Sequence, residues 1–180
     1  MISGPSGAGK GTLVTRVRER RSNLGLTVSA TTRAPRKGEV DGVNYFFLTR
    51  EEFDRRVANG EFVQWAEVHG NCYGTLVSEV QSKLASGSSL ILEIDVQGAL
   101  QVKERFPEAV LIFIKPPSLE VLRERLVGRG TETPDTIELR MANAAHELAL
   151  ADRYDDVVVN DDLDRATDEL VRVLDMHERI

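Results

Sequence analysis

The sequence predicts an α/β fold in which a parallel sheet lies between two layers of helices. Short, continuous runs rich in Leu, Ile and Val recur along the chain, as expected for strands buried on both faces. Segments with helical periodicity separate these runs, and a glycine-rich turn directly precedes the first helical segment. Alternation of this kind builds βαβ units, in which a helix connects two parallel strands.

Each predicted element is bounded by polar residues, glycine or proline. Strands are predicted at residues 26–29, 90–94, 110–114 and 157–159. Helices are predicted at residues 10–21, 77–85, 97–105, 119–126, 136–151 and 163–177. Ser118 follows two prolines and is expected to cap the helix at 119–126, while Gly128 and Gly130 are expected to stop it.

Residues 44–73 show a different pattern of predicted strands and helices from the rest of the chain. Half-exposed strands are predicted at 44–48 and 61–69, with a short helix at 51–58 between them, so this segment forms a small α+β insert. Trp65 and the Phe46-Phe47 pair are expected to form the core of the insert, because large aromatic side chains dominate small cores. A role for Trp65 in stacking on a ligand is the alternative.

Composition and charge exclude several classes of protein. The 180 residues carry 23 Lys and Arg against 29 Asp and Glu, a net charge of −6, which argues against a nucleic-acid binder. The longest apolar run, residues 109–114, is too short to cross a membrane, and the N-terminus shows no secretory signal. Cys72 is the single cysteine, which fits a cytoplasmic protein. The sequence leaves a monomer and a homodimer equally open.

The glycine-rich turn has the spacing G-x-x-x-x-G-K of a P-loop. In such a loop successive backbone N–H groups surround phosphates, and Cβ atoms would block their approach. The following helix would add its N-terminal partial positive charge, and the lysine can reach the β- and γ-phosphates. A glycine-rich turn without function is the alternative. The expected phosphate-binding residues are Gly4, Pro5, Ser6, Gly7, Ala8, Gly9, Lys10, Gly11 and Thr12.

Two features of this loop depart from the commonest pattern. Gly11 occupies the position where many P-loops have a Ser or Thr that ligates Mg²⁺, so contact with the metal is expected to pass through water. Only Met1, Ile2 and Ser3 precede Gly4, whereas a typical strand has about five or six residues. We therefore expect the true start to lie upstream of Met1, with a shortened strand as the alternative.

A second loop, residues 31–39, carries two arginines three positions apart. Arg33 and Arg36 stand in the pattern Thr-Thr-Arg-Ala-Pro-Arg, and two guanidinium groups can grip a single phosphate through paired hydrogen bonds. Taken alone, this segment could equally be a solvated turn.

Further motifs surround these loops. The pattern S-x-T-T-R-x-P-R-x-G-E-x-x-G-x-x-Y runs from Ser29 to Tyr45. It is followed by GNCYGT at 70–75, EIDVQG at 93–98, RLVGRGTE at 125–132 and VNDD at 159–162. In this order, and over nearly the whole chain, the motifs closely resemble those of guanylate kinases.

The resemblance implies an ATP:GMP phosphotransferase of the P-loop class that uses Mg²⁺ with ATP. It also implies a P-loop core at residues 1–30, 76–124 and 143–180, a GMP-binding insert at 31–75 and a helical lid at 125–142. The P-loop, residues 4–12, would bind ATP. The catalytic residues implied are Lys10, Arg125, Arg129 and Arg140, the last three closing on the transferred phosphoryl group.

The resemblance also assigns an acceptor site. Its GMP-binding residues are Ser29, Arg33, Arg36, Glu39, Tyr45, Gln64, Tyr73, Thr75 and Asp95. Among them the arginines and tyrosines would hold the phosphate, and Thr75 and Asp95 would lie at the guanine base. Glu93 and Asp95 end a buried strand, where acidic residues stand near Mg²⁺ and would hold it through water; capping of the strand end is the alternative.

Gln64 departs from the family pattern, which commonly has glutamate there. A carboxylate accepts hydrogen bonds from guanine N1–H and the 2-amino group, whereas a carboxamide has one acceptor and an NH₂ donor. We therefore expect weaker discrimination between GMP and AMP, unless Asp95 or Glu67 compensates.

No strong general base is expected, since the attacking phosphate oxygen is already anionic near neutral pH and the three histidines are scattered. Catalysis would rest on alignment and charge neutralisation. Two alternatives remain: a monophosphate kinase with relaxed base specificity, and a non-catalytic guanylate-kinase-like binding module. The complete P-loop, with Gly7, Gly9 and Lys10, favours the enzyme.

Overall fold

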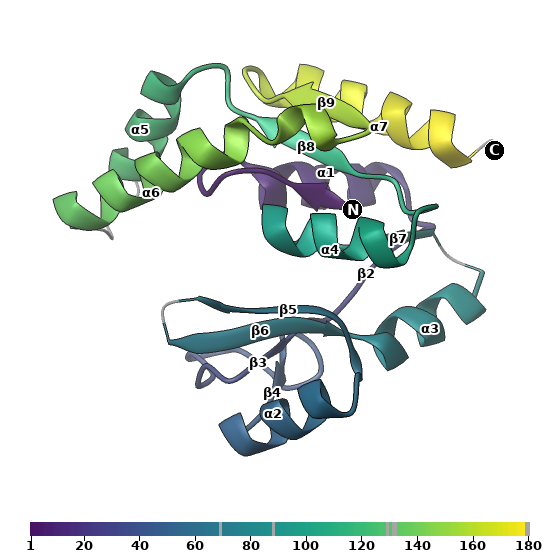
Figure 1. Ribbon diagram of the computed structural model, residues 1–180. Helices are drawn as coiled ribbons and strands as arrows, with labels where there is room; N and C mark the ends of the chain where they lie inside the picture. The colour runs from purple at the N-terminus through teal and green to yellow at the C-terminus, as the bar shows by residue number, and fades with distance from the viewer. Residues whose placement is uncertain (69, 88, 129, 131–132, 179–180) are drawn as a thin grey trace. The chain divides into compact units, whose positions relative to one another are not determined.

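The computed structural model describes residues 1–68, 70–87, 89–128, 130 and 133–178. The chain divides into two compact units (Figure 1). The P-loop unit comprises Met1–Ser22 and Glu93–Ile180, and the insert unit comprises Asn23–Leu92.

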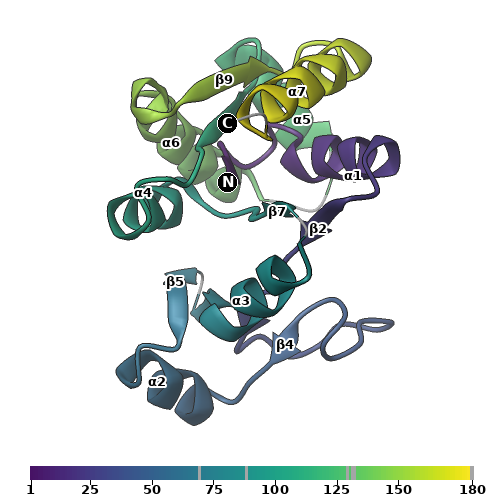
Figure 2. The same ribbon diagram turned by 90° about the vertical axis from the view of Figure 1, so that its right-hand side faces the viewer.

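The P-loop unit is built on three parallel strands in the order β1-β8-β9. These are β1 (Ile2–Ser3), β8 (Ile112–Lys115) and β9 (Asp156–Val159). The helices are α1 (Lys10–Arg20), α4 (Val96–Arg105), α5 (Leu119–Gly128), α6 (Pro134–Leu148) and α7 (Leu163–Glu178), with a 3-10 turn η1 (Ala151–Arg153). Figure 2 shows α1 and α7 on one side of the strands and α4 and α6 on the other. The predicted layered arrangement with a parallel sheet is confirmed.

The core of this unit lies where the helices meet the central strand. Phe113 and Ile114 of β8 are fully buried, as are Leu13 and Val17 on one face of α1. Complete burial of such side chains stabilises a fold by about 1.5–3 kcal/mol each. The ring of Phe113 meets Tyr154 edge-on, with centroids 5.0 Å apart, so the segment leading into β9 is fixed against the middle of the sheet.

The insert unit contains two small sheets. In one, β2 (Leu24–Leu26) pairs in parallel with β7 (Ser89–Ile91), and α3 (Val77–Ala85) lies between them in the sequence. The other has the order β4-β3-β6-β5. Its strands are β3 (Ala30–Thr31), β4 (Phe46–Phe47), β5 (Phe62–Val68) and β6 (Asn71–Leu76), and α2 (Arg50–Ala58) follows β4 in the chain.

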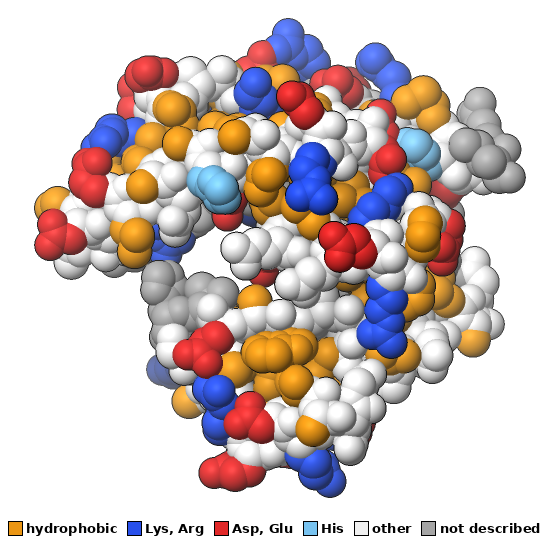
Figure 3. Space-filling model, viewed as in Figure 1, with side chains coloured by type: hydrophobic (Ala, Val, Ile, Leu, Met, Phe, Trp, Pro, Cys, Tyr) orange, Lys and Arg blue, Asp and Glu red, His pale blue; other side chains and the backbone are white. Residues whose placement is uncertain are grey.

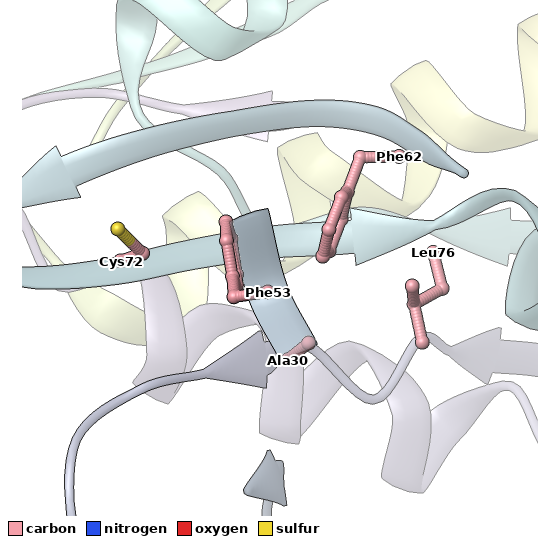
Figure 4. Close-up of a cluster of buried hydrophobic side chains, with 5 residues drawn as sticks. All are labelled: Ala30, Phe53, Phe62, Cys72 and Leu76. Atoms are coloured by element: carbon pink, nitrogen blue, oxygen red, sulfur yellow. The ribbon is translucent and has the colours of Figure 1, made fainter. Parts of the chain in front are cut away.

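One face of this four-stranded sheet forms a hydrophobic core. Figure 4 shows its buried members, which come from β3, α2, β5 and β6: Ala30, Phe53, Phe62, Cys72 and Leu76. The Phe53 and Phe62 rings stack with centroids 4.4 Å apart. Thr49 caps α2 by accepting a hydrogen bond from the Glu52 backbone N–H, which fixes where the helix begins.

Several predicted elements differ from the structure. The strand predicted at 26–29 is displaced to Leu24–Leu26, because the Val28 N–H donates to the Glu79 carboxylate instead of continuing the sheet. The last long helix before β9 begins at Pro134, where the Thr133 hydroxyl caps it, and ends at Leu148 rather than 151. Ser118 caps α5 as predicted, by accepting from the Val121 N–H, and α5 ends at Gly128.

Two errors concern the insert. The prediction that Trp65 forms its core is wrong: Trp65 is 42% exposed, and its ring meets Phe53 in an edge-to-face arrangement with centroids 6.2 Å apart. The strand β6 was not predicted, because glycines and Asn71 weaken its strand signal. In the sheet Gly74 is required, since a Cβ there would lie 2.7 Å from the Phe62 ring. The end of the strand predicted at 61–69, His69, lies outside the described residues.

Charges are mixed on the face of the molecule that Figure 3 shows. On the face shown in Figure 3, the described Lys and Arg side chains are interspersed with Asp and Glu rather than gathered into one basic field. Among the described residues, no helix combines the length and the apolar character needed to cross a membrane.

Candidate active site

The P-loop turns sharply between β1 and α1, and glycine is required at both of its ends. Gly4 has φ +143°, and a Cβ there would lie 2.2 Å from the Ile114 carbonyl oxygen of β8. Gly9 has φ +90°, and a Cβ there would lie 2.3 Å from Nδ2 of Asn160. Side chains rarely adopt such backbone angles, so both steric crowding and conformation exclude larger residues.

Lys10 stands at the first position of α1 and folds back over the loop. Its Nζ donates to the Gly4 carbonyl at 2.6 Å and to the Pro5 carbonyl at 3.1 Å. The residue before it, Gly9, has no side chain with which to cap the helix. The first N–H groups of α1 and the lysine charge therefore both favour an anion at this turn.

Two of the three predicted phosphoryl-binding arginines reach this loop. From α6, Nη1 of Arg140 donates to the Ser6 hydroxyl at 2.5 Å. From α5, Arg125 donates to the Asn160 carbonyl at 2.8 Å and to the Ala8 carbonyl at 3.5 Å. Positive charge thus converges on the loop from three helices. The third predicted arginine, Arg129, lies outside the described residues.

Asn160 contacts the P-loop, and the sequence prediction did not select it. It follows β9, is 5% exposed, and its Nδ2 donates to the Ala8 carbonyl at 2.8 Å. Its own carbonyl accepts from Arg125, so it holds the loop and an arginine together. The VNDD motif in which it stands was the available signal.

The two acidic residues that follow β7 differ in their contacts. Glu93 lies beside Gly11, whose added Cβ would be 3.6 Å from Oε1 of the carboxylate. Burial raises the pKa of Glu93, and the nearby Lys10 partly offsets this. Asp95 caps α4, because its Oδ1 accepts from the Gly98 N–H at 2.7 Å. One oxygen of Asp95 is thus engaged at the start of α4.

A further carboxylate, Glu147, was also missed. It lies seven residues after Arg140 on α6, close to two helical turns, so both side chains occupy the same face of that helix. Burial raises the pKa of Glu147, Lys10 opposes that rise, and the carboxylate of Asp95 adds to it. Glu147 therefore adds negative charge to the surroundings of Lys10.

In the insert unit, the arginine loop is tied to β6 through two neighbouring threonines. The Thr32 N–H donates to the Cys72 carbonyl at 3.0 Å, and the Cys72 N–H donates to the Thr32 hydroxyl at 2.8 Å. The Thr31 hydroxyl also donates to the Cys72 carbonyl and accepts from the Arg33 N–H. These contacts fix the backbone from which Arg33 extends.

The Arg33 guanidinium is held by a carboxylate and by aromatic rings. Its Nη2 donates to both oxygens of Glu39, at 2.8 and 3.0 Å, and its Cζ lies 5.4 Å from the centre of the Tyr45 ring. The hydrogen bonds from Arg33, together with the Arg36 N–H, lower the pKa of Glu39. Phe47, whose ring centre is 5.9 Å from the guanidinium, belongs to this group and not to the core predicted for it.

Three further predicted acceptor residues, Gln64, Tyr73 and Thr75, share the face of the sheet opposite the hydrophobic core. Gln64 pairs with Thr75 across β5 and β6, and Ala66 pairs with Tyr73. Both members of the first pair are buried, and Nε2 of Gln64 donates to the Thr75 hydroxyl at 3.2 Å. Tyr73 also lies edge-on to Tyr45, with centroids 6.3 Å apart, which links this face to Arg33.

Comparison with known proteins gives consistent results. A family model described as guanylate kinase matches residues 1–177. The chain belongs to the guanylate kinase family. It is 52% identical to the guanylate kinase of Halalkalibacterium halodurans over 97% of this chain and 85% of that protein, and 55% identical to that of Gloeobacter violaceus over the same shares. The crystal structure of guanylate kinase from Anaplasma phagocytophilum matches with a TM-score of 0.77 and 38% identity, covering 97% of this chain and 82% of that one.

In this guanylate kinase family member, the predicted residues form two groups, one in each unit. The P-loop, Lys10, Arg125, Arg140, Glu93 and Asp95 belong to the P-loop unit. Arg33, Arg36, Glu39, Tyr45, Gln64, Tyr73 and Thr75 belong to the insert unit, as does Ser29, whose carbonyl accepts from the Phe46 N–H. Each group is assembled within its own unit, from segments far apart in the sequence.

Proposed function

We propose that the chain transfers the γ-phosphoryl group of ATP to GMP, giving ADP and GDP. The observation that carries the proposal is the convergence of Lys10, Arg125 and Arg140 on a P-loop that only glycine can form. A second group able to hold a phosphate, centred on Arg33, stands in the same chain. The relatives that the chain matches are named guanylate kinase, which agrees with one group for ATP and one for GMP.

The proposed reaction needs charge neutralisation more than proton transfer. An oxygen of the GMP phosphate attacks the γ-phosphorus, the bond from that phosphorus to the oxygen bridging to the β-phosphate breaks, and ADP leaves with the electron pair. Lys10, Arg125 and Arg140 would neutralise the phosphoryl oxygens, and Arg33 would orient the acceptor with Arg36, Tyr45 and Tyr73. In the insert unit Glu39 holds Arg33 in place, which lowers the entropy lost when the acceptor binds.

Magnesium is the metal that these residues suit. Glu93 and Asp95 offer carboxylate oxygens, the donors that Mg²⁺ prefers, and Glu93 lies beside Gly11 of the P-loop. Among the described residues no group of three or more His, Cys, Asp or Glu side chains could hold a metal ion. We propose that these two residues hold Mg²⁺ through water together with the phosphates of ATP. The bound ion would neutralise phosphate charge and orient the phosphate chain.

We assign residues 31–75 to the GMP-binding insert, 125–142 to the lid and the remainder to the core. Arg129 belongs to the proposed lid by the RLVGRGTE motif, and Ser29 and Thr75 belong to the acceptor site. A role in purine nucleotide metabolism, by recycling GMP, follows from the proposed reaction. We place the reaction in the cytoplasm, where the single cysteine is in keeping with a reducing compartment. A monomer or a homodimer is compatible with this assignment.

The alternative of a non-catalytic binding module is disfavoured by the contacts of the P-loop. Lys10, Arg125, Arg140 and Asn160 all hydrogen-bond to that loop, and a module that binds no ATP has no use for them. The test is release of ADP from ATP and Mg²⁺ with a panel of nucleoside monophosphates. We expect GMP to give the highest rate. A rate with GMP no greater than that of ATP alone, from folded protein, would exclude the proposal.

A further inference from the structure

One polar contact among the proposed GMP-binding residues joins two buried side chains, Gln64 and Thr75. Gln64 is 8% exposed, Thr75 is fully buried, and the carboxamide Nε2 donates to the threonine hydroxyl at 3.2 Å. The residues are cross-strand partners, so the backbone keeps the side chains together.

The partners in this pair can exchange roles without losing their hydrogen bond. A threonine hydroxyl both donates and accepts, and a carboxamide has a donor and an acceptor of nearly equal shape. With Nε2 donating to Thr75, the contact does not use the Gln64 oxygen, which can then accept a hydrogen bond from a ligand. After a half-turn about the last side-chain bond, the oxygen accepts from the hydroxyl and the NH₂ group faces the ligand.

The two orientations complement different purines. Guanine carries a hydrogen on N1, and the outward oxygen accepts from that N–H. Adenine has an unprotonated N1 that accepts, and the outward NH₂ group donates to it. A glutamate at this position would be an acceptor in either orientation and would oppose the adenine lone pair.

We propose that Gln64 allows the acceptor site to take AMP as well as GMP, because its carboxamide can reverse on Thr75. Gln64 is then the residue that determines base specificity, and Thr75 is a positioning residue that acts through it. This inference rests on the proposed function, since it assumes that a purine monophosphate binds on this face. The sequence suggested that the NH₂ group of Gln64 would face the donors of guanine. In the structure that group donates to Thr75 instead, so it need not oppose guanine.

The test compares kcat/KM for GMP, AMP and IMP in the native chain and in Gln64→Glu, at saturating ATP and Mg²⁺. Each AMP turnover yields two ADP molecules, so the rates are corrected for this. We expect Gln64→Glu to lower kcat/KM for AMP by about tenfold or more relative to GMP. IMP carries hydrogen on N1 but lacks the 2-amino group. We expect Gln64→Glu to change kcat/KM for IMP in the same direction as kcat/KM for GMP.

Gln81→Glu is the matched control. It makes the same change at an exposed position of α3 in the same unit, and we expect it to leave the AMP-to-GMP ratio unchanged. Thr75→Val tests the positioning role: both kcat/KM values should fall, and Thr75→Ser should restore them. Unchanged kinetics in Thr75→Val would show that Thr75 does not orient Gln64 and would overturn the proposal.

Two further outcomes separate this inference from the proposed function. If GMP is phosphorylated but Gln64→Glu changes the AMP and GMP values by the same factor, the inference fails and the proposed function stands. If GMP is not phosphorylated, the proposed function fails. Calorimetric titration of each variant with GMP and AMP, without ATP, then measures the base preference directly, and equal preference in the native chain and Gln64→Glu overturns the inference. Circular dichroism and thermal unfolding confirm that each variant is folded.

Discussion

The Asn160 carboxamide donates a hydrogen bond of 2.8 Å to the Ala8 carbonyl, across 152 positions of sequence. It joins the end of β9 to the middle of the P-loop, and the Asn160 carbonyl accepts in turn from Arg125. The conformation of the loop is thus fixed by the Asn160 amide, which binds the Ala8 carbonyl, and by Lys10, which binds the carbonyls of Gly4 and Pro5. A phosphate-binding loop that is held in shape by such contacts loses less entropy when ATP binds.

Asn160→Asp is expected to weaken both the fold and ATP binding. A carboxylate oxygen would face the Ala8 carbonyl, and an unsatisfied buried acceptor costs about 1–3 kcal/mol. Urea unfolding should show this loss in the free energy of unfolding, and steady-state kinetics should show a higher KM for ATP. Asn23→Asp, at an exposed position, is the matched control and should change neither quantity. Equal effects in the two variants would contradict the role given to Asn160.

Gly9→Ala is expected to abolish most of the activity. The positive φ costs about 1–2 kcal/mol for any residue with a Cβ, and the new methyl would also collide with Nδ2 of Asn160. Gly60→Ala is the control, since Gly60 has φ +69° but a Cβ there meets nothing within 4 Å. Both variants should lose similar stability from backbone strain, and only Gly9→Ala should lose ATP binding in a titration. Retained ATP affinity in Gly9→Ala would show that the contact with Asn160 is unimportant.

Arg33→Lys is expected to raise the KM for GMP by about tenfold or more while leaving the KM for ATP nearly unchanged. A lysine cannot make the paired hydrogen bonds of a guanidinium, nor lie flat against Tyr45. Arg56→Lys on α2 is the control, because Arg56 also pairs with a glutamate but lies in no proposed site. A similar rise in both Michaelis constants would point to general damage instead.

Glu93→Gln is expected to raise the Mg²⁺ concentration that gives half-maximal activity by about tenfold, since a neutral amide binds the hydrated ion more weakly. Its folding stability should not fall, because burial already disfavours the charged form of Glu93. Glu104→Gln, an exposed position on α4, is the control. The measurements are magnesium titrations of activity and urea unfolding. An unchanged magnesium dependence would remove Glu93 from the proposed metal site.

The free energy of unfolding is expected to fall as pH rises from about 10 to about 12. Burial raises the pKa of Tyr154 to about 12, and the carboxylates of Asp95 and Glu147 add to the rise. In the unfolded chain a tyrosine ionises near pH 10, so at alkaline pH the unfolded state releases this proton first and is favoured. Tyr154→Phe keeps the packing on Phe113 and should reduce the slope. Urea unfolding at several pH values measures it, and an unaltered slope would assign the dependence to other groups.

The phosphate sites illustrate how much of the chemistry can be predicted from sequence. The P-loop is a local feature: its backbone angles and the start of α1 at Lys10 follow from residue types within ten positions. The helices are likewise set by local periodicity and caps, and α3 begins and ends where predicted. The arginine loop was recognisable from its spacing and from the family resemblance. Its attachment to Cys72 was not, because hydrogen bonds between distant backbones leave no sequence signal.

Sequence by itself determined the α/β class and the order of most of the helices and strands, and it predicted the two phosphate-binding groups, since local periodicity and short-range spacing encode these properties. Only the tertiary structure decided which side chains share a surface. Phe62 and Gln64 are two positions apart and would share a face of a regular strand, yet a register shift between them places Phe62 in the core and Gln64 against Thr75 on the opposite face. Such an irregularity depends on packing against neighbouring strands, and the pattern of a single strand does not contain it.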